Sequence, residues 1–159
     1  MIEHPIPPLY NRDSKILILG SFPSVKSREQ MFFYGHPKNR FWKVVSTVFG
    51  CKEPKTIEEK KQFLFDSGIA LWDVIASCEI IGSSDSSIKN VKANDLLEIL
   101  KEADIRQIFV NGKTAEKYFK KYTQAQINRA AVYLPSTSPA NAAWSLEDLV
   151  EKWEVLRSI

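Results

Sequence analysis

The sequence predicts an α/β fold in which helices cover both faces of a parallel sheet. Two observations carry this prediction. Four short apolar runs are bounded by turn or polar residues, and between them lie stretches whose apolar residues recur every three or four positions. Because parallel strands need a crossover connection, usually a helix, this alternation favours parallel pairing. We expect one domain over residues 1–159, with no repeat and no linker.

The apolar runs predict strands that are buried on both faces of the sheet. The first is Lys15–Leu19, which Gly20 closes. The other three are Ile69–Trp72, Ile105–Val110 and Ala130–Leu134. Their order along the chain, with helical stretches between them, predicts one four-stranded parallel sheet.

Helical periodicity predicts the remaining elements. Apolar residues recur at helical spacing over residues 41–48, 96–100, 115–122 and 146–156. The segment Thr56–Asp66 also reads as a helix, because its charged residues form one outer face and Gly68 stands just beyond its end.

The composition describes a mildly basic protein. Lys and Arg number 22 against 19 Asp and Glu, and the net charge of +3 permits a nucleic-acid partner without implying one. Cys51 and Cys78 are too few for a four-thiolate zinc or iron–sulfur site or for a secreted disulfide scaffold. We therefore expect a reducing, cytoplasmic environment.

No part of the sequence predicts a membrane segment. No apolar run approaches the roughly 20 residues that a membrane helix needs, and the polar, proline-containing start Met1–Pro8 does not look like a signal peptide. We expect a soluble monomer that does not associate with membranes.

Ligands of parallel α/β sheets bind where the carboxyl ends of the strands enter loops. The segments at this edge are Gly20–Ser24, Asp73 with the polar stretch Gly82–Asn90, Asn111–Lys113 and Leu134–Asn141. Neither G-x-x-x-x-G-K-[ST] nor G-x-G-x-x-G is present, which removes the main support for ATP or NAD chemistry. Gly20–Ser24 reads as a rigid turn in which Phe22 either stacks on a planar ligand or lies in the core.

The most informative stretch is Phe32–Trp42, with five aromatic residues. Phe41 and Trp42 fit the apolar face of the following helix and are expected in the core. Asn39 has two open interpretations, a helix N-cap or an amide presented to a substrate or a water. His36 precedes a proline and is expected in a turn. No second histidine in this region supports a metal site, since His4 lies in the N-terminal tail.

Charge and aromatic residues are interleaved over residues 26–43. Glu29 is the only acid there, and the cations are Lys26, Arg28, Lys38, Arg40 and Lys43. With Phe32, Phe33 and Tyr34, they have the composition of a surface that contacts phosphates while an aromatic ring stacks on a base. A solvated basic face is the alternative. Leu134–Asn141, with its three hydroxyls, suits phosphate oxygens or is a plain loop.

Several of these blocks together resemble the uracil-DNA glycosylase superfamily. The first three are Gly20–Ser24, Phe33–Trp42 and Leu134–Asn141, and the His-Pro-x-Asn-x-Phe-Trp pattern is similar to the mismatch-specific branch. Ser83–Ile88, Asn111–Lys113 and the Ser-Thr-Ser-Pro-Ala-Asn form of the late loop are similar to the hypoxanthine-DNA (deoxyinosine) glycosylase branch. The resemblance spans nearly the whole chain, in order, and implies a three-layer α/β/α sandwich around a four-stranded parallel sheet.

The resemblance also implies roles in DNA repair for these blocks. The turn with Ser21 and Phe22 would touch a flipped base and position water, and Phe33 would stack on that base. The late loop would grip phosphates and open the helix, through Ser136, Thr137, Ser138 and Asn141. From the charge of residues 26–43, we expect Lys26 and Arg28 to contact phosphates as well. Phe22 stands where uracil-specific relatives carry Asp or Asn, and Leu134 where they carry His, which favours hypoxanthine over uracil.

The resemblance places a catalytic asparagine at Asn39, which favours a functional role for it beside the cap. Amide donors such as Asn39, Asn111 and the Ser21–Phe22 backbone would stabilise the leaving base. An amide does not take a proton near neutral pH, so Asp73, and after it Asp85, are the candidate bases. The resemblance matches Asp73 to a base-recognition position.

The predicted activity is excision of a deaminated base, most readily hypoxanthine, by base flipping, with water as nucleophile and without metal or cofactor. Three alternatives are open: a uracil or mismatch glycosylase of the same superfamily, a non-catalytic reader of damaged DNA, and a hydrolase of free nucleosides.

Overall fold

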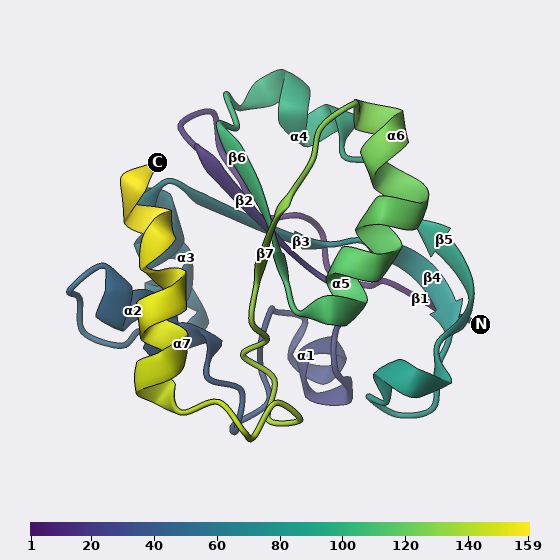
Figure 1. Ribbon diagram of the computed structural model, residues 1–159, viewed down its shortest axis with the longest axis horizontal. Helices are drawn as coiled ribbons and strands as arrows, with labels where there is room; N and C mark the ends of the chain where they lie inside the picture. Colours follow the sequence, from purple (N-terminus) through teal and green to yellow (C-terminus); the bar gives the residue numbers. More distant parts are fainter.

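The computed structural model describes residues 1–159 and confirms the predicted fold class (Figure 1). Its centre is a four-stranded sheet in the order β3-β2-β6-β7, with every pair parallel. The strands are β2 (Ile16–Gly20), β3 (Ile69–Asp73), β6 (Gln107–Asn111) and β7 (Val132–Leu134). Asp73 and Asn111, which we expected just after strands, are therefore the last residues of β3 and β6.

Helices cover both faces of this sheet (Figure 1). On one face lie α2 (Phe41–Val48), α3 (Ile57–Ser67) and α7 (Leu146–Trp153), and on the other α4 (Leu97–Glu102), α5 (Lys113–Tyr118) and α6 (Gln124–Ile127). In β2, Ile16 and Ile18 belong to the first of these cores, and Leu17 and Leu19 belong to the second. All four side chains are nearly inaccessible to solvent, which explains why β2 is an uninterrupted apolar run.

The helix predicted from Thr56–Asp66 is α3, and its ends have clear local causes. Thr56 and Glu59 form a reciprocal capping box at its start, and Gly68 ends it with a φ of 70°. The closing helix α7 begins in the same way, with Ser145 and Asp148 as its capping box. The chain then ends in the 3₁₀-helix η3 (Glu154–Ser158).

The structure also contains a second, antiparallel sheet, which the sequence did not predict. It has three strands in the order β1-β4-β5, namely β1 (Ile2–Glu3), β4 (Ile75–Glu79) and β5 (Lys89–Ala93). The stretch Gly82–Asn90, expected to be a loop throughout, contains the 3₁₀-helix η1 (Asp85–Ser87) and the start of β5. Every residue of β5 is exposed or half-buried, so the strand has no apolar run to reveal it.

Two helical segments also differ from expectation. The turn Gly20–Ser24 leads directly into a short helix, α1 (Val25–Gln30), which Ser24 caps. The helix expected over residues 115–122 runs further, from α5 through the π-helix η2 (Phe119–Thr123) into α6. No helix in the chain is both long and apolar enough to cross a membrane.

Candidate active site

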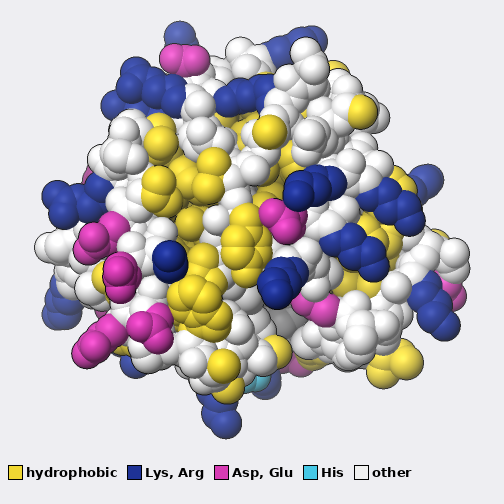
Figure 2. Space-filling model, viewed as in Figure 1, with side chains coloured by type: hydrophobic (Ala, Val, Ile, Leu, Met, Phe, Trp, Pro, Cys, Tyr) yellow, Lys and Arg dark blue, Asp and Glu magenta, His cyan; other side chains and the backbone are white.

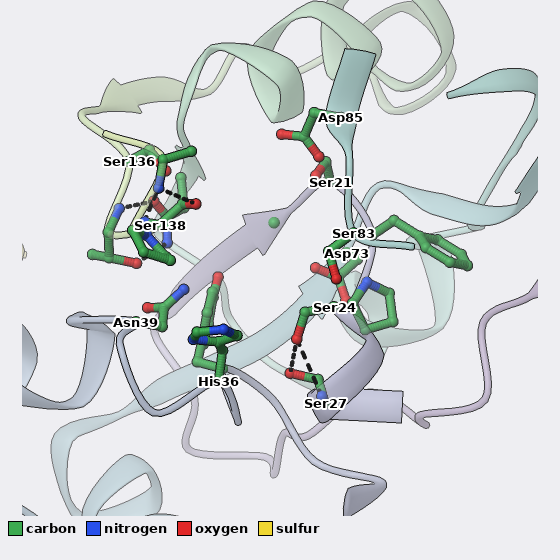
Figure 3. Close-up of a pocket in the computed structure, with 18 of the residues that line it drawn as sticks. Ser21, Ser24, Ser27, His36, Asn39, Asp73, Ser83, Asp85, Ser136 and Ser138 are labelled. Atoms are coloured by element: carbon green, nitrogen blue, oxygen red, sulfur yellow. Dashed lines mark hydrogen bonds between the residues drawn. The ribbon is translucent and has the colours of Figure 1, made fainter. Parts of the chain in front are cut away.

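The carboxyl end of the parallel sheet opens into a cleft of about 550 Å³ (Figure 3). Its walls come from the ends of β2, β3 and β6, from residues 33–39, from the loop around η1 at 83–86, and from the late loop at 136–140. All four segments expected at this edge therefore contribute to one cleft, as the topology of a parallel sheet requires.

Asp73 is the buried carboxylate of the cleft. Its Oδ2 accepts a hydrogen bond of 2.7 Å from Nε2 of His4, and both side chains are almost fully buried, at 6% and 3% exposure. The other ring nitrogen of His4, Nδ1, accepts from the backbone N–H of Ile6 at 3.2 Å. A ring nitrogen that accepts carries no proton, so His4 is the Nε2–H tautomer.

His4 is a site residue that the sequence interpretation placed in the tail. Strand β1 pairs with β4, and the N–H of His4 donates to the carbonyl of Ala76, so the tail continues the antiparallel sheet. The ring then packs edge-on against Phe22 and Trp72. No periodicity marks such a contact, since it joins residues 69 positions apart.

Gly20 makes room for the Asp73 side chain. A Cβ at this position would lie 2.4 Å from Oδ1 of Asp73 and 3.3 Å from the hydroxyl of Tyr34. No side chain fits there without displacing both groups, so the missing Cβ of Gly20 shapes the floor of the cleft.

Tyr34 lines the cleft, and the sequence interpretation did not assign it a separate role. Its ring stacks on Phe41 with centroids 4.0 Å apart, and its backbone has a left-handed φ of 52°. The hydroxyl is buried without a hydrogen-bond partner. Burial and the negative charge of Asp73 raise the pKa of Tyr34, so its hydroxyl stays protonated. Phe33, expected to stack on the base, also lines the cleft but is only 3% exposed and packs on Phe32.

Asn39 shows how its two interpretations combine. Its Oδ1 accepts a hydrogen bond of 2.9 Å from the N–H of Phe41, in the first turn of α2. Because the oxygen faces that N–H, the amide nitrogen is turned toward the cleft, as Figure 3 shows. Arg40, not Asn39, is the N-cap residue of α2, but the Asn39 oxygen still binds the N–H of the first helical residue, and its nitrogen presents only donors to a ligand.

Asn111 ties the end of β6 to the late loop. Its Nδ2 donates to Oγ1 of Thr137 and its Oδ1 accepts from the N–H of Thr137, both at 3.1 Å. Thr137 is fully buried by this pairing, so the phosphate contact expected of its side chain does not fit its position. Asn111 keeps one amide hydrogen that is not used in the pair.

The rest of the late loop is braced from within. Oγ of Ser136 accepts from the N–H of Ser138, and Nδ2 of Asn141 donates to the carbonyl of Ser136. Arg40 donates to the carbonyls of Asn141 and Trp144 and so fastens the loop to α2. Ser136 and Ser138 are half-buried on the cleft wall, whereas Asn141 is outside it.

The first turn contributes Ser21 and Phe22 to the cleft wall. The ring of Phe22 is only 9% exposed, because His4 packs on its edge and the guanidinium of Arg28 lies 5.6 Å from its centroid. Both open interpretations of Phe22 thus hold in part, since it belongs to the core and also borders the cleft.

The expected phosphate-binding cations lie outside the cleft wall. Lys26 is exposed and 3.7 Å from Glu29, and Arg28 donates to the carbonyl of Gly82 at 2.7 Å. A further basic group was not singled out from the sequence: α5 and η2 carry Lys113, Lys117, Lys120 and Lys121. Figure 2 shows Lys and Arg side chains gathered over these elements, and α5 begins beside Asn111 of the cleft.

The side chains of the cleft do not form a metal-binding set. No three His, Cys, Asp or Glu side chains in the chain lie close enough together to hold a metal ion. The polar side chains that line the cleft are the amides of Asn39 and Asn111, the carboxylates of Asp73 and Asp85, the imidazole of His36 and several hydroxyls.

A model of the uracil DNA glycosylase superfamily matches residues 7–158. This chain belongs to the uracil DNA glycosylase superfamily. The match covers the whole parallel sheet and every segment of the cleft, and it leaves out only residues 1–6, with β1 and His4, and the last residue, so it confirms the resemblance found in the sequence.

Individual relatives agree with the family. The chain is 34% identical over 163 residues to a hypoxanthine DNA glycosylase of Methanosarcina acetivorans, with 98% of both chains covered. A hypoxanthine DNA glycosylase of Methanosarcina barkeri is 31% identical over 122 residues, covering 74% of this chain and 76% of the relative. A candidate uracil DNA glycosylase from Methanosarcina acetivorans, solved by NMR in solution, superposes with a TM-score of 0.81 at 30% identity and 99% coverage of both chains.

These similarities confirm the expected class of enzyme. The protein is a DNA repair glycosylase, a hydrolase that acts on N-glycosyl bonds, and its partner is DNA.

Proposed function

We propose that this glycosylase removes hypoxanthine from deoxyinosine in DNA. Two relatives that carry that activity in their names support the choice of base. So do the departures from the uracil-specific pattern: Phe22 offers the cleft a ring instead of an amide or carboxylate, and Leu134 is 2% exposed in the core. A cytoplasmic, monomeric enzyme is part of the same proposal.

The nucleotide must leave the duplex before the cleft can reach its glycosidic bond. Flipping costs a few kcal/mol, and the cost is smaller for a mispaired base such as hypoxanthine, so mispairing contributes to selectivity. The exposed Lys26 and the half-buried Arg28, together with the hydroxyls of Ser136 and Ser138 and the amide of Asn141, are assigned to the DNA backbone around the flipped nucleotide.

Breaking the bond between C1′ and N9 separates charge. The sugar becomes oxocarbenium-like, while the base leaves with the electron pair on its rings and carbonyl. We assign Asn39 to the leaving base because its amide nitrogen faces the cleft while its amide oxygen is turned to the N–H of Phe41. An N–H donor in a fixed direction stabilises the negative charge on the leaving base without any proton transfer.

We assign Asp73 to the positive charge that develops on the sugar. Its carboxylate is fixed by His4 through Oδ2, which leaves Oδ1 on the Gly20 side of the cleft. A carboxylate in this position orients the attacking water and favours the positive charge on the sugar. Phe33 and Tyr34 supply the aromatic wall against which the base lies.

Strand cleavage at the damaged base tests the proposal. The purified protein is incubated in EDTA with duplexes that contain one hypoxanthine or one uracil, and abasic sites are then cleaved with alkali. Scission at hypoxanthine alone is expected. Scission at uracil would return the enzyme to the mismatch branch, and binding without scission at either base would indicate a reader of damaged DNA.

A further inference from the structure

The loop around η1 is the part of the cleft wall that the proposed function leaves unused. Ser83, Ser84, Asp85 and Ser86 all line the cleft. In Figure 3 the Asp85 carboxylate lies beside Ser21, across the cleft from Asn39. The cleft therefore holds a second carboxylate, on a different wall from Asp73.

Hydrogen bonds on both sides fix this loop in place. Arg28 donates to the carbonyl of Gly82 at 2.7 Å, and the N–H of Val25 donates to Oγ of Ser83 at 3.0 Å, so α1 holds one side. Within the loop, Oγ of Ser87 accepts from the N–H of Ile81 and donates to the carbonyl of Ser84. Asp85 is thus presented from a braced turn.

The surroundings of Asp85 raise the pKa of its carboxyl. Asp85 is an exposed residue on the cleft wall, and partial desolvation of its carboxyl raises the pKa more than hydrogen bonds from Thr114 of α5 and from Ser21 lower it. Tyr118 of α5 is near enough for the charge of Asp85 to contribute to the raised pKa of its phenol. Asp85 forms no ion pair with any Lys, Arg or His.

We propose that Asp85 is the general acid that protonates a ring nitrogen, N7 or N3, of the departing purine. As the bond between C1′ and N9 breaks, its electron pair moves into the purine, and the proton of Asp85 forms a bond to the ring nitrogen. The base leaves as neutral hypoxanthine. Water oriented by Asp73 then adds to C1′ and releases its proton to the solvent, and the exposed Asp85 carboxylate takes up a proton from the solvent, so the acid is regenerated.

This inference rests on the proposed function, because it needs a purine. Hypoxanthine offers basic imine nitrogens at N7 and N3, whereas both ring nitrogens of uracil are already substituted or protonated. A carboxylic acid on the cleft wall therefore has a partner only when the flipped base is a purine. Asn39, which donates from the other wall, cannot supply a proton itself.

The test compares the wild type with Asp85→Asn in single turnover on duplexes containing deoxyinosine, 7-deazadeoxyinosine or 3-deazadeoxyinosine. We expect Asp85→Asn to be about 100-fold slower or more on deoxyinosine, within the range that general acids contribute. If Asp85 protonates N7, the wild type and Asp85→Asn should cleave 7-deazadeoxyinosine at the same rate. If it protonates N3, their rates should be the same on 3-deazadeoxyinosine. Asp85→Glu should recover part of the rate on deoxyinosine.

A pH profile gives a second readout that does not depend on cleavage of the analogues. The single-turnover rate of the wild type should fall as pH rises through the pKa of Asp85, and Asp85→Asn should lose that fall. Asp104→Asn, which removes an exposed charge outside the cleft, controls for altered DNA binding.

The outcomes separate the two proposals. Equal rates of wild type and Asp85→Asn on deoxyinosine, or the same loss on all three substrates together with an unchanged pH profile, would overturn the role of Asp85. Absence of wild-type cleavage at deoxyinosine would overturn the proposed function instead.

Discussion

Nε2 of His4 donates a 2.7 Å hydrogen bond to Oδ2 of Asp73, and this pair joins the antiparallel sheet to the edge of the parallel one. The N–H of Ile6 holds the other side of the ring and so selects the donating tautomer. The second sheet therefore has a direct connection to the cleft, because it orients the Asp73 carboxylate, to which we assign a role in the reaction.

Replacement of His4 tests this connection. His4→Ala leaves the Asp73 carboxylate buried without its partner, which should cost about 1–3 kcal/mol in the free energy of unfolding and lower the excision rate. His4→Gln retains a side-chain N–H donor and should recover part of both. Denaturant unfolding and single-turnover rates measure the two effects. An unchanged rate in His4→Ala would show that Asp73 needs no support from the ring.

Asn39 allows its two roles to be separated by substitution. Asn39→Asp keeps an oxygen for the N–H of Phe41, the first residue of α2, but it removes the amide donor. We expect near-normal stability and a loss of excision by orders of magnitude. Asn39→Ala should lose both the hydrogen bond and the donor, with a stability cost of about 0.5–1.5 kcal/mol. An Asn39→Asp protein that cleaves deoxyinosine normally would limit Asn39 to a structural role at the start of α2.

Gly20→Ala places a methyl group within 2.4 Å of Oδ1 of Asp73. Overpacking of this kind typically costs about 1–3 kcal/mol, and the displaced carboxylate should lower the excision rate about tenfold or more. Gly50→Ala is the matched control, since Gly50 has a left-handed φ of 66° but open space around it. Thermal unfolding should register both substitutions, while the activity assay should register only the first.

The salt dependence of DNA binding tests the assigned cations. Lys26→Ala should weaken binding to any sequence and flatten the slope of log K against log salt by about 0.9 for each phosphate that the side chain neutralises. Arg28→Ala should also disturb the loop at Gly82, so its excision rate should fall further than its affinity. Lys55, 68% exposed and outside the cleft, provides a control substitution. A slope identical to that of the wild type would assign the phosphate contacts to other residues.

Tyr34 predicts a loss of stability in alkali. Its hydroxyl is buried and its pKa is raised, so the folded state resists ionisation, whereas in the unfolded chain the group ionises near the ordinary tyrosine pKa of 10.0. The free energy of unfolding should therefore fall as pH rises above 10.0. In Tyr34→Phe, the contribution of this tyrosine to the decrease in stability above pH 10.0 should be absent. At pH 7 the substitution should leave the free energy of unfolding unchanged or increase it, because an unpaired buried hydroxyl is removed. Denaturant unfolding at several pH values compares the two proteins.

Local patterns in the sequence were enough for the main sheet and its helices. The run Lys15–Leu19 identified the central strand because both of its faces are buried, and Thr56 with Gly68 marked both ends of α3. The topology of a parallel sheet then predicted that the segments after its strands would meet at one edge, and they do.

The tertiary structure decided how the cleft works. Asn111 meets Thr137 across 26 positions, and His4 meets Asp73 across 69, through a sheet whose polar edge strand has no apolar pattern. Periodicity shows which face of a helix or strand is buried, because apolar side chains occupy the positions that point into the core. It does not encode which side chains from distant segments share a hydrogen bond, since that depends on strand order and register, which are set only when all the layers pack together.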